Sequence, residues 1–427
     1  MRLALRPAIL NAFLALALFG QDNHTLTLEQ AEQLALHNHP RIGAAAMNAQ
    51  AAGTAVRQVK AAYQPLLSGN LTTVGADTGT SIGAGTLQTS GLSSRGAIGV
   101  GISQLVTDFG RTASLAESAR LRAASQDRNT ATARAQVLVQ VDQAYFSVLA
   151  AEAVLQVARA QVEMQRLTLR QVQALAASNL KSTLDVSFAE VSVSEAELAL
   201  YQAENTAKAN RALLSSAIGE VTDSRFAIAD VPLPGPVEGD MESLVGESLR
   251  NRPELSAAKL NQSAAEHFAD AEKRLRYPSV SVVGVLGAIP VHQGNLSTQY
   301  GAAGVNVSIP FLNGGLYAAR RDEADYRARQ AEKESDAIAI QVAAGVRVAW
   351  IEADNAWRRL DLTAKLVDQA TTTLRLAKTR YEIGLSGILE LTQAQLSLTS
   401  AQIAAANAKY DYLNRRAALK YAIGAFH

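Results

Sequence analysis

Apolar residues recur at every seventh position along two long stretches of this chain. The two runs are Val141, Val148, Leu155, Val162, Leu169 and Ala176, and then Val346, Ala353, Leu360, Val367, Leu374 and Tyr381. A seven-residue repeat sustained this long is typical of helices that wind around each other as a coiled coil. We therefore predict two very long helices, at 111–177 and 316–383, each about 100 Å long. The molecule should be elongated.

A shorter helix with the same spacing follows each long one, at 186–217 and 391–422. Its apolar positions are Val186, Val193, Leu200, Ala207 and Leu214 in the first case, and Leu391, Leu398, Ala405, Tyr412 and Leu419 in the second. Each long helix and its shorter successor should form an antiparallel hairpin. Alanine fills a second seam position in both short helices, which lets the backbones approach closely. These residues are Ala189, Ala196 and Ala203, and Ala394, Ala401 and Ala408.

Two other regions alternate with a period of two, as strands do. Ile98, Val100 and Ile102 are separated by glycines, and a similar alternation precedes 309. We predict two strands at about 66–105 and two at about 279–309, joined by hairpin loops at 77–94 and 290–299. Strands of about ten residues suit a tilted membrane barrel. Four strands cannot close, and an open edge in lipid leaves backbone groups unsatisfied. Subunits would have to pool strands, eight in a dimer or twelve in a trimer.

The two halves of the chain repeat each other. Asn38 and Pro40 recur as Asn251 and Pro253 at a shift of 213, whereas Gly219 recurs as Gly424 at a shift of 205. The first copy therefore carries about eight extra residues. We predict a tandem duplication, because a fixed-period self-similarity marks a repeat architecture. The first repeat is 21–230, a Pro- and Gly-rich linker is 231–239, and the second repeat is 240–427. Each begins with a helical stretch, at 28–62 and 241–276.

The N-terminus has the pattern of a secretory signal peptide at 1–20. Arg2 and Arg6 precede an apolar run over 8–19, the small residues Ala15, Ala17 and Gly20 lie at its end, and polar residues follow at 21–23. The run is too short to span a bilayer as a helix, which needs about 20 residues. The alternative is a buried N-terminal helix. No other uninterrupted apolar run of about 18 residues follows, so we expect no membrane-spanning α-helix.

Composition narrows the classes of function. The 427 residues include 40 Lys and Arg against 39 Asp and Glu, which argues against a nucleic-acid partner, since phosphate binding needs a cationic surplus. No cysteine is present, which excludes disulfides, thiolate metal sites and thiol nucleophiles. The six histidines form no HExxH pair, and no Walker loop occurs. We therefore expect no enzyme activity, no catalytic residues, no cofactor and no metal site.

The order of these features resembles the TolC family of bacterial outer-membrane efflux and secretion channels, over nearly the whole mature chain. The motifs that carry the resemblance are Asn38-His39-Pro40, Tyr63-Gln64-Pro65, Leu184-Asp185-Val186, Ile309-Pro310-Phe311-Leu312-Asn313-Gly314-Gly315, Tyr381-Glu382-Ile383-Gly384 and Leu389-Glu390-Leu391. The resemblance implies a mainly α fold with membrane β-strands. Long coiled-coil hairpins would form a periplasmic α-barrel, and a homotrimer would pool four strands per chain into a twelve-stranded outer-membrane β-barrel.

The resemblance also implies a passive exit duct for efflux or type I secretion. Its partners would be outer-membrane lipid, a periplasmic adaptor (membrane fusion) protein, and an inner-membrane pump or ABC transporter. It would lie in the outer membrane and extend into the periplasm. The alternative is a periplasmic or surface coiled-coil scaffold or adhesin, in which the strand-like regions are merely loops.

Family channels narrow at the periplasmic tip, and motif position carries this aperture onto a few residues here. They are Asp185, Tyr381, Ser386, Glu390 and Gln393. Ser386 stands where the family's closing arginine is expected, and Gln393 replaces a second acid. A ring of carboxylates would favour cations. The alternative is that Asp185 and Glu390 simply begin helices, where negative charge suits the helix dipole.

The turns between the helices of each hairpin are the adaptor-docking surface that the resemblance implies. They comprise Asn179, Leu180 and Lys181 in the first hairpin, and Gly384, Leu385, Ser386 and Gly387 in the second. Gly, and less easily Asn, tolerates the positive φ that such turns need. Glu190, Glu197 and Glu204 also form a stripe with a spacing of seven. That stripe could line a tunnel or form a solvated outer face.

Overall fold

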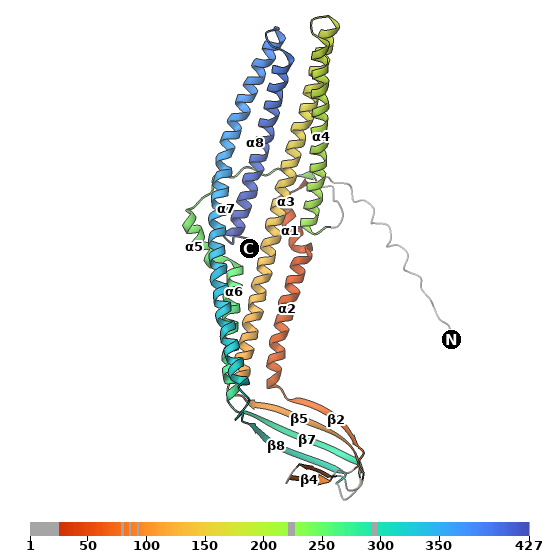
Figure 1. Cartoon of the computed structure of the whole chain (residues 1–427), viewed down its shortest axis with the longest axis vertical. Helices are drawn as coiled ribbons and strands as arrows, with labels where there is room; N and C mark the ends of the chain where they lie inside the picture. The colour runs from red at the N-terminus through yellow and green to blue at the C-terminus, as the bar shows by residue number, and fades with distance from the viewer. Residues whose placement is uncertain are drawn as a thin grey trace, which may run out of the picture.

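The computed structural model describes residues 25–77, 81–84, 87–91, 94–220, 227–292 and 297–426. The molecule is elongated, with a sheet at one end and the tips of two helical hairpins at the other (Figure 1). The signal peptide predicted at 1–20 lies outside the described residues. Each half of the chain supplies one long helical hairpin and two long strands.

The four helices of the two hairpins are α3 (Arg111–Ala177), α4 (Thr183–Ile218), α7 (Leu316–Glu382) and α8 (Ile388–Ala422). Both long helices have 67 residues, and α3 has the bounds predicted from the sequence. The alanine seam is buried throughout α4 and α8. Both return helices begin three residues earlier than predicted. In α4 the reason is a capping box, because the Ser182 side chain accepts from the Asp185 amide and Asp185 accepts in return from the Ser182 amide.

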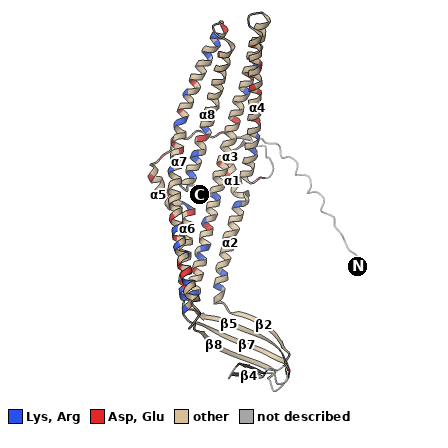
Figure 2. Ribbon diagram, viewed as in Figure 1, with Lys and Arg blue, Asp and Glu red and all other residues tan. Residues whose placement is uncertain are grey.

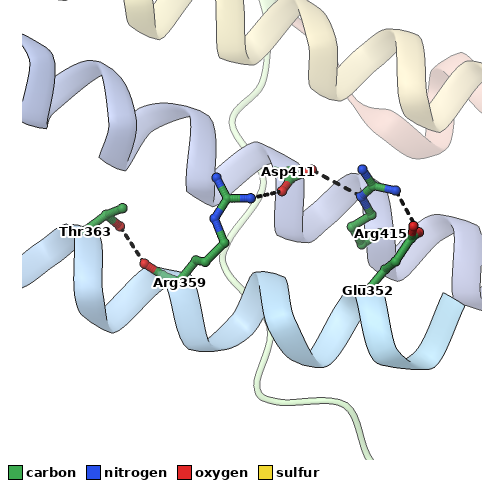
Figure 3. Close-up of polar contacts among 5 residues, drawn as sticks. All are labelled: Glu352, Arg359, Thr363, Asp411 and Arg415. Atoms are coloured by element: carbon green, nitrogen blue, oxygen red, sulfur yellow. Dashed lines mark hydrogen bonds and ion pairs between the residues drawn. The ribbon is translucent and has the colours of Figure 1, made fainter. Parts of the chain in front are cut away.

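Ion pairs tie the two helices of each hairpin together. In the second hairpin, Arg359 and Arg415 both bind Asp411, at 3.0 and 3.3 Å, and Arg415 also reaches Glu352 at 2.7 Å (Figure 3). In the first, Arg166 binds Glu197 at 2.7 Å and Arg159 lies 3.9 Å from Glu204. Two members of the acidic stripe therefore pair with α3. These pairs are partly exposed, so each contributes up to about 1 kcal/mol.

The helical stretch that opens each repeat is broken, contrary to the prediction of a continuous helix. It forms α1 (Leu28–Asn38) and α2 (Pro40–Lys60), with a 3-10 turn η1 (Ala61–Tyr63), and then α5 (Met241–Asn251), α6 (Pro253–Lys273) and η2 (Arg274–Arg276). A proline pushes the residue before it out of the helical region. His39 has φ −72° and ψ 120°, and Arg252 has φ −64° and ψ 118°. Each proline then begins the next helix.

The motifs that reveal the duplication touch each other in space. Gly219 ends α4 with φ +88°, and a Cβ placed on it would lie 3.0 Å from the Cα of His39. In the second repeat, Gly424 has φ +79° and lies against the backbone of Asn251 and Arg252. The end of each return helix therefore packs against the bend in the backbone just before Pro40 or Pro253. Both the backbone conformation and the close approach require glycine.

Replacing Gly219 by alanine should lower the free energy of unfolding by about 2 kcal/mol, because a left-handed conformation is costly for any residue with a Cβ. The new methyl group would also press on the His39 backbone. Gly53→Ala is the matched control, since Gly53 is an exposed residue inside α2 with no atom within 4 Å of an added Cβ. That change should stabilise the protein by about 0.5–1 kcal/mol. Chemical unfolding followed by helical circular dichroism measures both, and equal effects would contradict this explanation.

The sheet contains four antiparallel strands in the order β2 (Leu66–Val74), β5 (Arg95–Thr107), β7 (Ser279–His292) and β8 (Gln299–Ser308). Leu71 pairs with Ile98, Val100 with Leu286, and Val282 with Val305, and these side chains share one exposed apolar face. The opposite face carries the row Asn70, Gly99, Gly287 and Tyr300. This is the predicted alternation. Figure 2 shows that Lys, Arg, Asp and Glu lie on the helices and that the four long strands are almost free of them.

Two short sheets were not predicted. Within 77–94, where a loop was expected, β3 (Ser81–Ala84) pairs with β4 (Leu87–Gly91). Near the middle of the molecule, β1 (Thr25–Leu26) pairs in parallel with β6 (Ala227–Ile228). The Tyr145 hydroxyl of α3 holds this second pair in place. It lies 2.9 Å from the Leu26 carbonyl and 2.6 Å from the Ala229 carbonyl, and it can donate a hydrogen bond to either of them. Contacts of this kind, between segments far apart in the chain, leave no periodic signal in the sequence.

The segment between the two repeats runs from 229 to 240 without helix or strand and includes the predicted linker. It crosses α8, where Tyr412 and Arg416 donate to the carbonyl of Gly235 at 2.5 and 2.7 Å. One stretch of α3 is apolar enough over 18 residues to cross a membrane by composition, with a mean hydropathy of 1.2. Because 56% of that window is buried inside the protein, it fits a packed core helix.

Candidate functional site at the hairpin tips

The two hairpin turns have the same backbone geometry. Asn179 and Gly384 both adopt positive φ, 57° and 79°, directly after the long helices. In each turn the amide of the following leucine donates to the carbonyl five residues earlier. Leu180 donates to Leu175 at 2.9 Å, and Leu385 donates to Arg380 at 2.8 Å. This is the Schellman ending of a helix. Both turns leave a leucine, Leu180 and Leu385, exposed at the end of the molecule.

The Tyr381 ring lies where the two hairpins meet. It is buried in a cluster with Val172 of α3, Ala189 of α4 and Leu391 of α8. The ammonium of Lys181, from the turn of the first hairpin, lies 4.2 Å from the ring centroid. A cation over an aromatic face is attracted by the ring quadrupole. Lys181 and Tyr381 therefore form a direct contact between the two tips.

The hydroxyl of Tyr381 is buried without a hydrogen-bond partner among the described residues. Burial raises the pKa of Tyr381, and the nearby Asp185 carboxylate raises it further. The ring therefore stays neutral at physiological pH, and its contribution to the contact comes from packing and from Lys181. The predicted aperture residues Asp185 and Tyr381 are thus close enough to interact.

The two predicted acids have different local roles. Asp185 caps the start of α4, as the helix-start alternative proposed, with its Oδ2 atom 3.2 Å from the Ser182 amide. At the equivalent place in α8, Gly387 is the N-cap residue and offers no side chain. Glu390 instead accepts from the Nε atom of Arg380 at 2.9 Å. Arg380 was not predicted from the sequence. The available signal was a basic residue ten positions before Glu390, on the other side of the hairpin turn.

The remaining predicted residues also lie at or near the hairpin tips. Ser386 is half-buried, and its hydroxyl has no hydrogen-bond partner among the described residues. Gln393 is exposed, as are Asn179, Gly384 and Gly387. Ser386 and Gln393, the two positions that depart from the family pattern, carry no charge and therefore cannot form ion pairs.

Below the tip the two hairpins meet along a polar seam that the heptad pattern did not predict. Gln395 of α8 donates to the Thr168 hydroxyl of α3 at 3.0 Å, and Thr399 contacts Gln161 at 2.5 Å. All but Thr399 are buried, and Gln165 joins them with an unpartnered side-chain oxygen. A cavity of about 890 Å³ lies beside this seam, lined from both hairpins. Polar contacts and empty space make this a loosely packed joint.

Comparison with known proteins agrees with this architecture. The sequence model of the family described as outer membrane efflux protein matches residues 31–220 and 244–425. The probable efflux pump outer membrane protein TtgC of Pseudomonas putida is 24% identical over 420 residues, which cover 94% of this chain and 83% of TtgC. The pyoverdine export outer membrane protein OpmQ of Pseudomonas aeruginosa is 25% identical over 308 residues, 71% of this chain and 64% of OpmQ.

A solved structure shows the same fold. The outer membrane protein VceC of Vibrio cholerae matches with a TM-score of 0.79 and 20% identity, over 93% of this chain and 96% of VceC. The outer-membrane channel OprN also matches, with a TM-score of 0.79 and 20% identity, over 93% of this chain and 89% of OprN. The two segments matched by the family model fall in the two halves of the duplication. The chain therefore belongs to the outer membrane efflux protein family, as its resemblance to TolC channels predicted, and is an outer-membrane duct for efflux or secretion.

Proposed function

We propose that three copies of this chain assemble into one channel. The four-stranded sheet has two edges, β2 and β8, that pair with no further strand in the described part of the chain. An exposed apolar face favours lipid contact, but unpaired edges are unfavourable there. Joining β8 of one copy to β2 of the next removes both edges, and three copies give twelve strands. The main support for the proposal is that β2 and β8 are unpaired edge strands of the sheet.

The helices offer matching surfaces for the same assembly. Exposed apolar residues follow a coiled-coil spacing along α4, at Leu184, Phe188, Val191 and Leu198. A second exposed apolar series on α7 includes Ile351, Leu362 and Leu366. Extended apolar faces of this kind mark association surfaces. We infer that α4 of one copy packs against α7 of the next, so that twelve helices continue the barrel as a periplasmic tunnel.

The hairpin tips then form the end of the duct that faces the inner membrane. A periplasmic adaptor protein would dock on the exposed turns around Leu180 and Leu385, and an inner-membrane pump or secretion transporter would supply the energy. The contacts of Lys181 with Tyr381 and of Arg380 with Glu390 hold the tips in the present arrangement. A passive channel of this kind needs no cofactor.

The assembly is tested on the full-length protein purified in detergent. Mass measurement should give three copies per particle, and insertion into planar lipid bilayers should give discrete conductance steps. A monodisperse monomer without pores would overturn both the trimer and its channel activity. Six or more copies that still conduct would overturn only the trimer.

Neutralising the tip acids should shift ion selectivity away from cations. The change is Asp185→Asn with Glu390→Gln, which keeps the α4 cap and removes up to six charges from a trimeric tip. A carboxylate ring attracts cations into a pore, so the reversal potential in a salt gradient should move toward zero. Glu323→Gln and Asp336→Asn on α7, far from the tip in sequence, form the matched control. An unchanged reversal potential in the tip variant would show that Asp185 and Glu390 do not line the aperture.

A further inference from the structure

A cavity of about 380 Å³ lies at the waist of the molecule, far from the tips. It opens between α1, α3 and α8, under the segment that links the two repeats. Its apolar lining includes Leu28, Phe146, Val237, Leu244, Leu413 and Ile423. Three carboxyl side chains also line it, Glu32 from α1, Asp142 from α3 and Glu238 from the linker. All of these residues belong to one subunit.

Asp142 is the unusual member of this group. It is only 3% exposed, and its Oδ1 atom has no hydrogen-bond partner among the described residues. Burial comes first, and a side-chain hydrogen bond with Glu32 and the charge of Glu32 add to it; together they raise the pKa of Asp142 to about 8, and Lys420 opposes the rise. Asp142 therefore shares a hydrogen bond with Glu32, but its Oδ1 atom is buried without a partner, which is costly to the fold. This free oxygen can accept a hydrogen bond from a ligand that enters the cavity.

The basic groups at the cavity do not neutralise these acids by direct contact. Arg416 donates to the Gly235 carbonyl at 2.7 Å and to the Tyr412 hydroxyl at 3.2 Å. Lys420 places its ammonium 4.5 Å from the centroid of the Phe426 ring. Within the described residues, none of Glu32, Asp142 and Glu238 takes part in a salt bridge. The cavity therefore combines an apolar wall with carboxyl groups that form no salt bridge among the described residues.

We propose that this waist cavity is a binding site for an organic ammonium ion with a compact apolar body, whose charged group binds Asp142 and Glu32. The ammonium would donate to the free Oδ1 atom of Asp142, and the apolar body would contact Phe146 and Leu413. Each part of such a ligand meets a matching group, and a neutral compound of equal shape would leave the carboxyl pair unsatisfied. The site is separate from the tip and from the barrel.

The direct test is calorimetric titration of the purified full-length protein, held in amphipol, with cyclohexylmethylamine at pH 8.5. We expect saturable binding with one site per chain, and no measurable binding of the neutral isostere cyclohexylmethanol. Asp142→Asn and Glu32→Gln should each weaken the amine at least tenfold. Asp127→Asn, an exposed position on the same helix, is the matched control and should bind as the wild type does.

The pH dependence provides a second readout that a misfolded variant could not mimic. Asp142 must lose its proton to pair with the ammonium, so the wild-type association constant should rise about tenfold per pH unit below pH 8 and level off above it. The Asp142→Asn variant should lose most of this slope. Equal affinity for the amine and the alcohol, wild-type affinity in both carboxyl variants, or binding that does not change between pH 6 and pH 8 would each overturn the proposal.

Discussion

Replacing Tyr381 by alanine is expected to raise the single-channel conductance several-fold. The ring fills the cluster formed by Val172, Ala189 and Leu391, and it carries the contact with Lys181. Its removal leaves a void in this cluster and releases Lys181, so the contact between the two tips is weakened. The seam below consists of buried polar contacts beside a cavity, and it offers little resistance to separation. Planar bilayer recordings at fixed voltage and salt measure the change.

Two further substitutions isolate the cause of this effect. Tyr381→Phe keeps the ring, and because the hydroxyl has no partner its loss should leave the conductance close to wild type. Lys181→Met removes only the cation–π contact and should give an intermediate increase. Tyr326→Ala on α7, where the tyrosine is exposed, controls for loss of an aromatic side chain from the same helix. If Tyr381→Ala conducts like the wild type, Tyr381 is part of the hairpin core and not of the closure.

The elements that the sequence predicts best are those with local periodicity. The predicted range of α3, 111–177, matches the 67-residue helix, and its heptad positions from Val141 to Ala176 lie along the seam with α4. The strands follow for the same reason from the alternation around Ile98 and Val100. Helix interruptions depend on single residues instead. Pro40 and Pro253 break helices that periodicity alone would continue, and Ser182 begins α4 earlier than its first heptad residue.

Less of the candidate site than of the fold could be predicted from the sequence. Motif position brings Asp185 and Tyr381 to the same tip, and the structure agrees that they are close. It could not show that Lys181 packs on Tyr381 or that Arg380 pairs with Glu390, because these contacts depend on how two turns approach each other. Of the three buried glutamines at this joint, Gln165 stands at a heptad seam position where an apolar residue is expected, and Gln161 and Gln395 lie next to seam positions. Such departures from a repeat mark the joint between the hairpins.

Replacing Glu272 by alanine should lower the free energy of unfolding by about 2–3 kcal/mol, because it removes charge-assisted hydrogen bonds to a buried carboxylate whose arginine partners are partly exposed. Glu272 is 3% exposed near the end of α6. Its carboxylate accepts two hydrogen bonds from Arg320 of α7, at 2.7 and 3.2 Å, and lies 3.7 Å from Arg111 of α3. The variant leaves two guanidinium groups facing each other where three helices join the sheet, and the Nε atom of Arg111 is already buried and unpartnered.

Thermal and chemical unfolding followed by helical circular dichroism measure this loss, and Glu266→Ala on α6 is the matched control. Glu266 is exposed and accepts only from Gln262 of its own helix, so its removal should change the free energy of unfolding by less than about 0.5 kcal/mol. The comparison separates the ion pair from helix propensity, since both changes introduce alanine into α6. Glu272→Gln should fall between the two, because an amide keeps the shape but not the charge. If Glu272→Ala costs no more than Glu266→Ala, Arg111 and Arg320 are adequately solvated without the carboxylate, and the three-helix junction is held by packing alone.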